Sequence, residues 1–397
     1  MPQNPLESLI IEQARALGPI TFARFMELAL YHVPWGYYSS GPERIGAAGD
    51  FYTGPVAHPA FGALLAVQLA DMWKGMDSPA TFHVVEMGAG AGVLARDVLE
   101  YADHVSPDFA DALRYVTIDR RMSHGARGAH PIVSDGVPLR TVTGCILSNE
   151  YLDAMPVHRV TVEDGRLREL YVEVGGEGLV EVTGEPSTGR LQERLDDLGI
   201  TLAEGQRAEI NLGLDDLLCS LARSLDSGYV LSIDYGHHAR DLYSASRFGG
   251  TLACHYRHTV NRHPFRRIGR QDITAHVDFT SLVQTGERRG FRSCGLVSQR
   301  QFLGNLGIVG IRDRLRDMAL PSARYHANLM GLGNLIDPEG LGGFKVCIQS
   351  KGVEARPLSG LGGRGRIFDD SLPVPLLSER HVNLLEGKYP HAAWDLG

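Results

Sequence analysis

Cysteine is scarce in this sequence, and the few cysteines follow no pattern. There are five among 397 residues, and no two of them have CxxC spacing. They are Cys145, Cys219, Cys254, Cys294 and Cys347. This odd number and scatter exclude a disulfide framework and a cysteine-based zinc site as organising features, and they are typical of a reducing compartment.

The sequence also lacks an excess of basic residues. Its 39 Lys and Arg stand against 47 Asp and Glu, which gives a formal net charge of −8. Short basic pairs, such as Arg120-Arg121 and Arg266-Arg267, are too small to form the extended basic face of a nucleic-acid-binding protein. We therefore expect no nucleic-acid partner.

Long apolar runs are absent as well. A membrane-spanning helix needs about 20 predominantly apolar residues, and the most apolar helical stretch, Phe61 to Trp73, is interrupted by Gln68 and Asp71. The N-terminal residues have no basic segment before an apolar one, which argues against a secretory signal and a transit peptide. We expect a cytoplasmic protein without a membrane span.

What the sequence does contain is an alternation of strand and helix patterns after a helical start. Apolar residues recur at helical spacing over the first 80 residues, with stretches from Leu6 to Leu17, from Thr21 onward and from Pro59 to Trp73. Short apolar runs then predict strands, separated by helical or irregular stretches. These are Phe82–Val85, Tyr115–Ile118, Cys145–Leu147, Tyr229–Ile233 and Phe344–Ile348. Such alternation predicts an α/β domain with a mostly parallel, doubly wound sheet.

Two segments differ from this core in their pattern of residues. Residues 158–183 alternate polar and apolar side chains around Asp164-Gly165, which predicts a β-hairpin. The residues from Gly352 are rich in Gly and Pro, and we expect an extended tail that either drapes over the body or is disordered. The expected segments are a helical region (1–80), the first half of the core (81–157), an insertion with the hairpin (158–225), the second half of the core (226–351) and the tail (352–397).

The strongest local signal is a glycine-rich turn between a strand and a helix. Gly88, Gly90 and Gly92 follow the strand that ends at Glu86-Met87, and such a turn lets a ligand approach the backbone. An acid at Glu86 can hold a positively charged amino group and would repel a pyrophosphate, which favours S-adenosylmethionine over NAD. Asp119, after the next strand, can accept hydrogen bonds from ribose hydroxyls. The alternative is a tight turn without a ligand and a solvated Asp119.

A second signal follows the strand at Cys145–Leu147. Asn149, Glu150 and Asp153 stand at the edge where open α/β sheets bind ligands, and they would put two carboxylates near a transferable methyl group. The alternative is helix N-terminal chemistry, in which Asn149 or Asp153 caps a helix and Glu150 interacts with the helix dipole.

Other polar residues are weaker candidates for a functional site. His237, His238 and His276 do not have the spacing of a metal site, and we expect structural histidines and no bound metal. Asp278 is expected to cap a helix that begins near Phe279.

Together these blocks identify the chain as similar to the MidA family of S-adenosylmethionine-dependent methyltransferases. The resemblance runs from about Gly18 to Ser350 and includes Gly49–Pro55, which is similar to the family's Gly-Asp-Phe-x-Thr-Ser-Pro signature. Its other blocks are Gly36–Tyr38, Glu86–Gly92, Asn149–Pro156, Asp234–Gly236, Gly250–His258 and Asp272–Phe279. The resemblance implies a Rossmann-like class I methyltransferase sheet with an N-terminal helical region and an inserted subdomain.

The resemblance also implies a reaction. Mitochondrial members of the family methylate arginine in respiratory complex I assembly, so it implies transfer of a methyl group from S-adenosylmethionine to an arginine guanidinium of a protein. Glu150 and Asp153 are the implied catalytic pair. The residues implied in cofactor binding are Asp50, Thr53, Glu86, Gly88, Gly90, Gly92, Asp119 and Asn149.

Departures from the family pattern leave other acceptors open. Ala89 and Ala91 stand where the family usually has Pro and Arg, and Asp119-Arg120-Arg121 replaces a Glu with a nearby Ser. A small molecule or modified peptide is an alternative acceptor, and a non-catalytic assembly factor that grips a partner is an alternative function. A homodimer is compatible with these observations.

Overall fold

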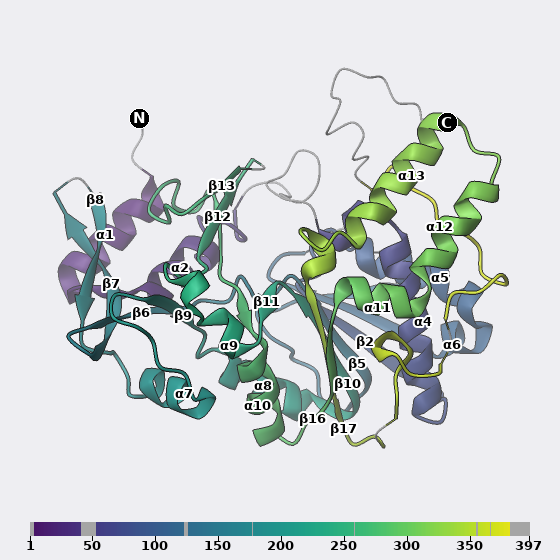
Figure 1. The fold of residues 1–397 in the computed structure, drawn as a ribbon, viewed down its shortest axis with the longest axis horizontal. Helices are drawn as coiled ribbons and strands as arrows, with labels where there is room; N and C mark the ends of the chain where they lie inside the picture. Colours follow the sequence, from purple (N-terminus) through teal and green to yellow (C-terminus); the bar gives the residue numbers. More distant parts are fainter. Residues whose placement is uncertain are drawn as a thin grey trace. The chain divides into compact units, whose positions relative to one another are not determined.

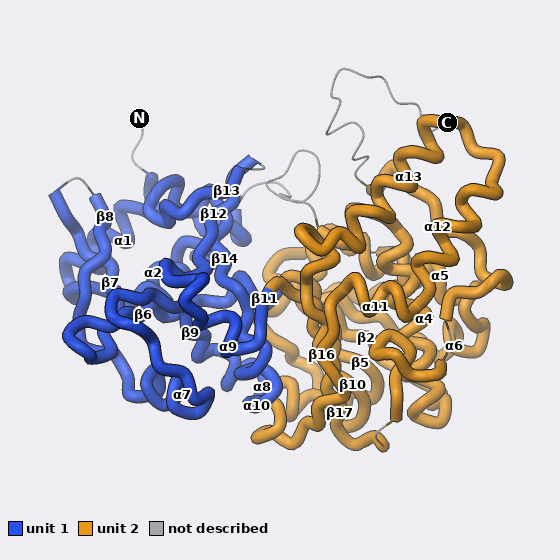
Figure 2. The backbone as a smooth tube through the Cα atoms, in the orientation of Figure 1, with its two compact units in different colours: residues 1–42, 151–218, 236–285 blue, residues 43–150, 219–235, 286–397 orange. Residues whose placement is uncertain are grey.

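The computed structural model describes residues 4–40, 53–122, 126–176, 178–257, 259–354, 356–365 and 367–381. The chain separates into two compact units, coloured in Figure 2. Unit 1 comprises residues 1–42, 151–218 and 236–285, and unit 2 comprises residues 43–150, 219–235 and 286–397. The units thus join segments that are distant in sequence, and the five expected segments remain predictions as domains.

Unit 2 contains the α/β core that the sequence predicts. Its sheet has the strand order β16-β17-β10-β5-β2-β3-β4 among the described residues, and only β17 runs antiparallel to its neighbours (Figure 1). The five strands that we expected are all present within it. The strands are β2 (Phe82–Met87), β3 (Leu113–Asp119), β4 (Ala129–Val133), β5 (Val142–Asn149), β10 (Leu225–Asp234), β16 (Arg292–Ser298) and β17 (Lys345–Lys351).

Helices of unit 2 pack against this sheet through a large apolar core. Helix α4 is buried over nearly its whole length, and Gly62 on α4 lets α5 approach so closely that an added Cβ would lie 2.4 Å from Asp97 Cβ. This close contact with α4 fixes the position of α5, the helix that follows the glycine turn. The helices are α3 (Gly54–Ala57), α4 (Ala60–Gly75), α5 (Val93–Val105), α6 (Pro107–Ala112), α11 (Gln299–Leu306), α12 (Ile308–Asp317) and α13 (Ser322–Leu335).

Unit 1 is built on the predicted hairpin. Strands β6 and β7 pair with Glu163 opposite Arg166, and Asp164 and Gly165 form the two-residue loop with φ of 53° and 69°, as a primed turn requires. A short strand, β1, joins this sheet with Ile20 opposite Val172, and the first two helices contact β7. Its helices are α1 (Pro5–Leu17), α2 (Phe22–Tyr31), α7 (Arg190–Leu198) and α9 (Ala239–Leu242). Its strands are β1 (Ile20–Thr21), β6 (His158–Glu163), β7 (Arg166–Gly175), β8 (Gly178–Gly184), β9 (Arg207–Ile210), β11 (Gly236–His237), β12 (Ala253–Tyr256), β13 (Thr259–Asn261), β14 (Asp272–Thr274) and β15 (Val277–Asp278).

Two helices, α8 (Leu214–Ser224) and α10 (Phe279–Arg288), continue across the boundaries of the units. The short 3-10 turns are η1 (Ala245–Arg247), η2 (Leu341–Gly343) and η3 (Ser359–Leu361). No helix of the described residues is long and apolar enough to cross a membrane.

The described part of the C-terminal tail packs on unit 2, which decides between the two expectations for it up to His381. Asp71 on α4 accepts hydrogen bonds from Arg356 Nη2 at 2.7 Å and from the Ser359 backbone N–H at 3.0 Å. Farther along, His381 Nε2 lies 2.9 Å from Asp97 Oδ2, and both side chains are buried. These contacts tie the tail to α4 and α5.

Candidate functional site

The glycine turn joins the carboxyl end of β2 to the start of α5. Gly88, Gly90 and Gly92 have φ of 69°, 50° and 69°, a left-handed conformation that a side chain strains. The Gly88 backbone N–H donates to Ile118 O at 2.8 Å, which holds the turn against the end of β3. The expected turn is therefore present, with its backbone bare of side chains at all three positions.

Asp119 stabilises this turn from the neighbouring strand. Its Oδ2 accepts a hydrogen bond from the Gly90 backbone N–H at 3.0 Å, and its Oδ1 accepts one from the Arg121 N–H at 3.4 Å. The alternative of a simply solvated strand end is wrong, because the carboxylate is engaged by the turn. One side chain thus links the ends of β2 and β3.

Glu86 lies beneath the turn in a buried position. Its side chain is 4% exposed, and its Oε2 accepts a hydrogen bond from the Tyr115 hydroxyl at 2.9 Å. Burial raises the pKa of Glu86 from 4.5 to about 8; the Tyr115 hydrogen bond opposes this effect, and the charge of Asp119 adds to it. Near neutral pH Glu86 is mostly protonated in the absence of a cation, which the sequence did not indicate.

Glu150 holds the start of α3 at the end of β5. Its Oε1 accepts hydrogen bonds from the Gly54 backbone N–H at 3.2 Å and from Asn149 Nδ2 at 3.1 Å. The Glu150 backbone has φ of 53°, and its N–H donates to Ile233 O at 2.9 Å. Thr53, the expected cofactor contact, is the buried N-cap of α3 but makes no side-chain capping bond, so Glu150 serves the helix end instead. Asp50 lies outside the described residues.

Several buried polar atoms at this edge of the sheet have no hydrogen-bond partner among the described residues. They are Thr117 Oγ1 on β3, Ser148 Oγ on β5 and Asn149 Oδ1. Thr117 pairs with Glu86 and Ser148 with Met87, so these atoms belong to the strand ends around the glycine turn. By this register Thr117 and Asn149 lie on the face of Glu86, whereas Ser148 lies on the opposite face. Buried polar groups normally have partners, so the unsatisfied atoms of Thr117 and Asn149 on the Glu86 face indicate a place for a polar ligand.

Asp153 belongs to unit 1, whereas Glu150 belongs to unit 2. The segment between them forms bends and turns, so the expectation that Asn149 or Asp153 caps a helix is wrong, although Glu150 does meet a helix start, that of α3. Around Asp153, the Tyr31 hydroxyl donates to Ala154 O at 2.8 Å, and the Tyr38 hydroxyl donates to Asp272 Oδ1 at 3.0 Å.

The tyrosines of this region form a small aromatic platform. The rings of Tyr31 and Tyr38 stack at 5.5 Å. Burial raises the pKa of Tyr38 well above its ordinary value, and the charges of Asp272 and Asp153 add to this effect. The grouping of Tyr38, Asp153 and Asp272 was missed from sequence, although all three residues stand in blocks that carried the family resemblance.

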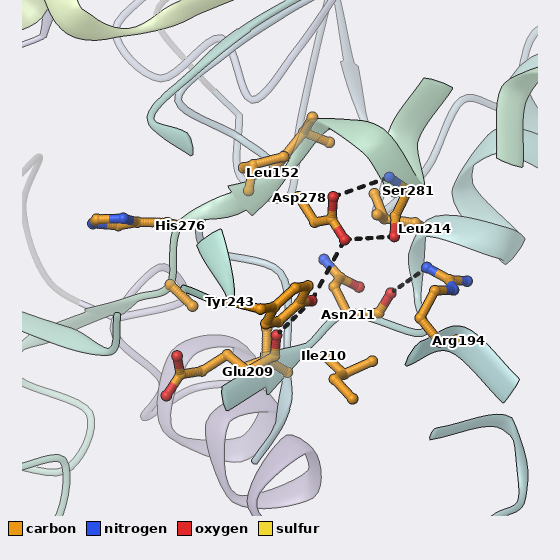
Figure 3. Close-up of a pocket in the computed structure, with 13 residues that line it drawn as sticks. Leu152, Arg194, Glu209, Ile210, Asn211, Leu214, Tyr243, His276, Asp278 and Ser281 are labelled. Carbon is orange, nitrogen blue, oxygen red and sulfur yellow. Dashed lines mark hydrogen bonds between the residues drawn. The ribbon is translucent and has the colours of Figure 1, made fainter. Parts of the chain in front are cut away.

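A second polar cluster of unit 1, shown in Figure 3, is structural. Asp278 accepts hydrogen bonds from the Ser281 backbone N–H at 3.0 Å and hydroxyl at 2.7 Å, which confirms that it caps α10. The Tyr243 hydroxyl also approaches Asp278 Oδ2 at 3.4 Å. Within the described ranges, no three His, Cys, Asp or Glu side chains are grouped so as to hold a metal ion.

Comparison with known proteins decides the family. The family model described as "Putative S-adenosyl-L-methionine-dependent methyltransferase" matches residues 64–297. The chain belongs to this methyltransferase family. S-adenosylmethionine is accordingly its cofactor, and the Rossmann-like α/β fold that we expected is confirmed.

Individual relatives are similar to this chain over most of its length. A crystal structure of a superfamily member from Burkholderia thailandensis bound to S-adenosyl-homocysteine is 30% identical, with a TM-score of 0.80 over 91% of this chain and 95% of that chain. The protein named protein arginine methyltransferase NDUFAF7 homolog, mitochondrial, from Drosophila melanogaster is 28% identical over 86% of this chain and 84% of its own length. The human protein arginine methyltransferase NDUFAF7, mitochondrial, is 24% identical over 86% of this chain and 82% of its own length.

Proposed function

We propose that this methyltransferase transfers a methyl group to a guanidinium nitrogen of an arginine in a protein partner. The names of its relatives from fly and human support the acceptor, since both are protein arginine methyltransferases. The carboxylates of Glu150 and Asp153 support the chemistry, because carboxylates recognise the planar guanidinium through paired hydrogen bonds.

The cofactor site in this proposal is the carboxyl edge of the unit 2 sheet. The observation that carries it is the pair of unsatisfied polar atoms on Thr117 and Asn149, which lie on the sheet face of Glu86. S-adenosylmethionine offers ammonium, hydroxyl and adenine groups that can satisfy such atoms, and the left-handed glycines leave its path to the backbone clear.

Each candidate residue has a definite part in this assignment. Glu86 would pair with the cofactor's ammonium group, and Asp119, already held by Gly90, would accept from the ribose. Asn149 would use its buried Oδ1 as an acceptor. Asp50 and Thr53 are assigned to the amino acid end of the cofactor by family resemblance.

The bound cofactor supplies an electrophilic methyl group on a sulfonium, and the task of the protein is to place the acceptor in line with it. The guanidinium has a pKa above about 12, so Glu150 and Asp153 do not deprotonate it beforehand. We assign to them the orientation of the guanidinium and late acceptance of its proton. Glu150 has in addition a structural duty, because it holds the N–H of Gly54.

Conservative variants separate these two duties of Glu150. Glu150→Gln retains an oxygen that can accept from Gly54 and Asn149 but removes the negative charge, whereas Glu150→Ala removes both. With arginine peptides and isotopically labelled S-adenosylmethionine, we expect kcat to fall about 100-fold or more in Glu150→Gln and in Asp153→Asn. Cofactor affinity in Glu150→Gln and Asp153→Asn should stay within about threefold of wild type.

Mass spectrometry of the labelled products identifies the acceptor. Methylarginine in arginine peptides, and none in matched lysine peptides, is the expected result. Labelled small molecules without labelled protein would instead establish the small-molecule acceptor. If the protein bound the cofactor but transferred no methyl group, and Glu150→Gln still bound its protein partner as wild type does, the enzymatic proposal would be contradicted. The assembly-factor function would then be favoured.

A further inference from the structure

An unusual concentration of positive charge occupies residues 257–270 of unit 1, which we call the basic loop. This segment contains five arginines and no Asp or Glu, although acidic residues outnumber basic ones in the chain as a whole. All five arginines are exposed: they are Arg257, Arg262, Arg266, Arg267 and Arg270. The segment includes β13 and connects β12 to β14.

Among the residues that the structure describes, much of this charge has no carboxylate partner. Some exposed arginines elsewhere have carboxylate partners, such as Glu27 for Arg24 at 2.7 Å and Asp215 for Arg190 at 2.5 Å, whereas scattered ones such as Arg140 have none among the described residues. In the part of the chain that the structure describes, no such ion pair includes Arg262, Arg266 or Arg267. Their guanidinium groups therefore remain available to carboxylates of another molecule.

Two of the arginines lie over the aromatic ring of Tyr256. The guanidinium carbon of Arg267 lies 4.4 Å from the ring centroid, and that of Arg257 lies 5.3 Å from it. Both arginines have left-handed backbone, with φ of 54° and 47°. Such conformations persist only where the surrounding structure imposes them, and they are concentrated at functional segments.

Interior contacts fix the rest of the loop. Gln271 Nε2 donates to His263 O at 2.9 Å, and Asn4 Nδ2 donates to Ile268 O at 2.7 Å. Phe265 packs edge-on against Phe25 with ring centroids 5.1 Å apart. These contacts fix the backbone of the loop, so less conformational entropy is lost on binding than from a flexible segment, which favours specific recognition over a diffuse attraction.

We propose that the basic loop docks an acidic segment of the protein methyl acceptor. This inference rests on the proposed protein acceptor. Guanidinium groups recognise carboxylates in a paired geometry, and the exposed Val260 on β13 offers an apolar contact beside them. The patch is confined to one loop of a chain with net charge −8, which favours an acidic protein segment over the long phosphate backbone of a nucleic acid.

The loop leads directly toward the carboxylates of unit 1. It ends at β14, whose first residue, Asp272, accepts a hydrogen bond from Tyr38, and the charge of Asp153 acts on the same tyrosine. An acceptor with an acidic stretch near its arginine could engage both places within this one unit. The loop would then supply selectivity, whereas Asp153 orients the reacting group.

Two synthetic peptides test the docking. Both carry one arginine and a fluorescein label; the acidic peptide has a following run of glutamates, and the neutral peptide has glutamines in their place. Binding is measured by fluorescence anisotropy with S-adenosylhomocysteine present. The variants are R262E/R266E/R267E and the matched control R140E/R289E/R300E, which changes three exposed arginines of unit 2.

We expect wild type to bind the acidic peptide at least about tenfold more tightly than the neutral one at low salt. R262E/R266E/R267E should lose this preference, the control should keep it, and high salt should reduce it. In turnover, the loop variant should raise KM for the acidic peptide and leave kcat unchanged.

Equal binding of the two peptides by wild type, or equal loss of preference in the control, would overturn the docking inference. Tighter binding of a single-stranded RNA of equal charge would also overturn it, because the patch would then select phosphates. The two proposals fail separately. A preference for the acidic peptide without arginine methylation refutes the proposed function alone, and methylation without preference refutes the docking alone.

Discussion

The buried carboxyl of Glu86 makes stability and cofactor binding depend on pH in a way that can be calculated. In the folded protein its pKa is raised from 4.5 to about 8, mainly because burial disfavours the charged form. The folded state therefore binds a proton that the unfolded state releases between these two values. Stability is fully present below about pH 4.5 and is lost progressively as the pH rises to about 8.

The size of the effect follows from the shift. At about 1.4 kcal/mol per pKa unit, moving from 4.5 to about 8 corresponds to about 5 kcal/mol for the complete titration. Between pH 5.5 and 8 about 3 kcal/mol of this should be lost from the free energy of unfolding. Glu86→Gln keeps an oxygen that can accept from Tyr115 and cannot ionise, so it should lack this loss.

Urea unfolding of the wild type and Glu86→Gln at the two pH values measures the difference. Fluorescence is a suitable signal, since Trp73 is buried in the core of unit 2. We expect the stability of wild type relative to the variant to fall by about 3 kcal/mol from pH 5.5 to pH 8. Parallel pH profiles of the two proteins would refute the assignment of a protonated, buried Glu86.

Cofactor binding adds a second expectation for the same residue. An ammonium group beside Glu86 favours its ionised form, so binding at pH 7 should release nearly one proton per chain. Calorimetry in buffers of different ionisation enthalpy measures this number. Wild type should show the release and Glu86→Gln should not; equal release by both would mean that Glu86 does not meet the cation.

Three further predictions concern single substitutions. Gly90→Val places a branched side chain at φ 50° in the cofactor turn and should weaken cofactor binding about tenfold or more in calorimetry, whereas unchanged affinity would contradict the assignment of the turn. Gly165→Val strains the hairpin loop at φ 69° and should destabilise unit 1 by about 1–2 kcal/mol in denaturant unfolding; an unaltered midpoint would count against the primed turn. His381→Ala leaves Asp97 buried without its partner and should cost about 2–4 kcal/mol in unit 2, a loss that Asp97→Asn in the same chain should partly restore.

Local patterns in the sequence predicted the core strands and the hairpin because both depend on neighbours in the chain. Asp164-Gly165 favours a two-residue turn by backbone preference alone, and the structure has that turn. The glycine turn was predicted for the same reason. Asp278 as a helix cap also required only the residues that follow it.

Contacts between distant residues could not be predicted in this way. The bond between Glu86 and Tyr115 depends on the register of two parallel strands, which pairs Glu86 with Thr117. Tyr38 and Asp272 are 234 residues apart. Capping by Asn149 or Asp153 failed because polar residues of this kind favour turns as well as helix starts, and the turn is what formed. Glu150 meets a helix start, but that of α3, which is distant in sequence.

The most direct test of the central claim is a calorimetric titration of the wild-type protein with S-adenosylmethionine, repeated with S-adenosylhomocysteine. We predict saturable binding of one molecule per chain, competition between the two ligands and a rise in unfolding temperature with either ligand. No binding heat in any buffer, together with no thermal stabilisation, would contradict the cofactor site at the glycine turn and the methyl transfer that depends on it.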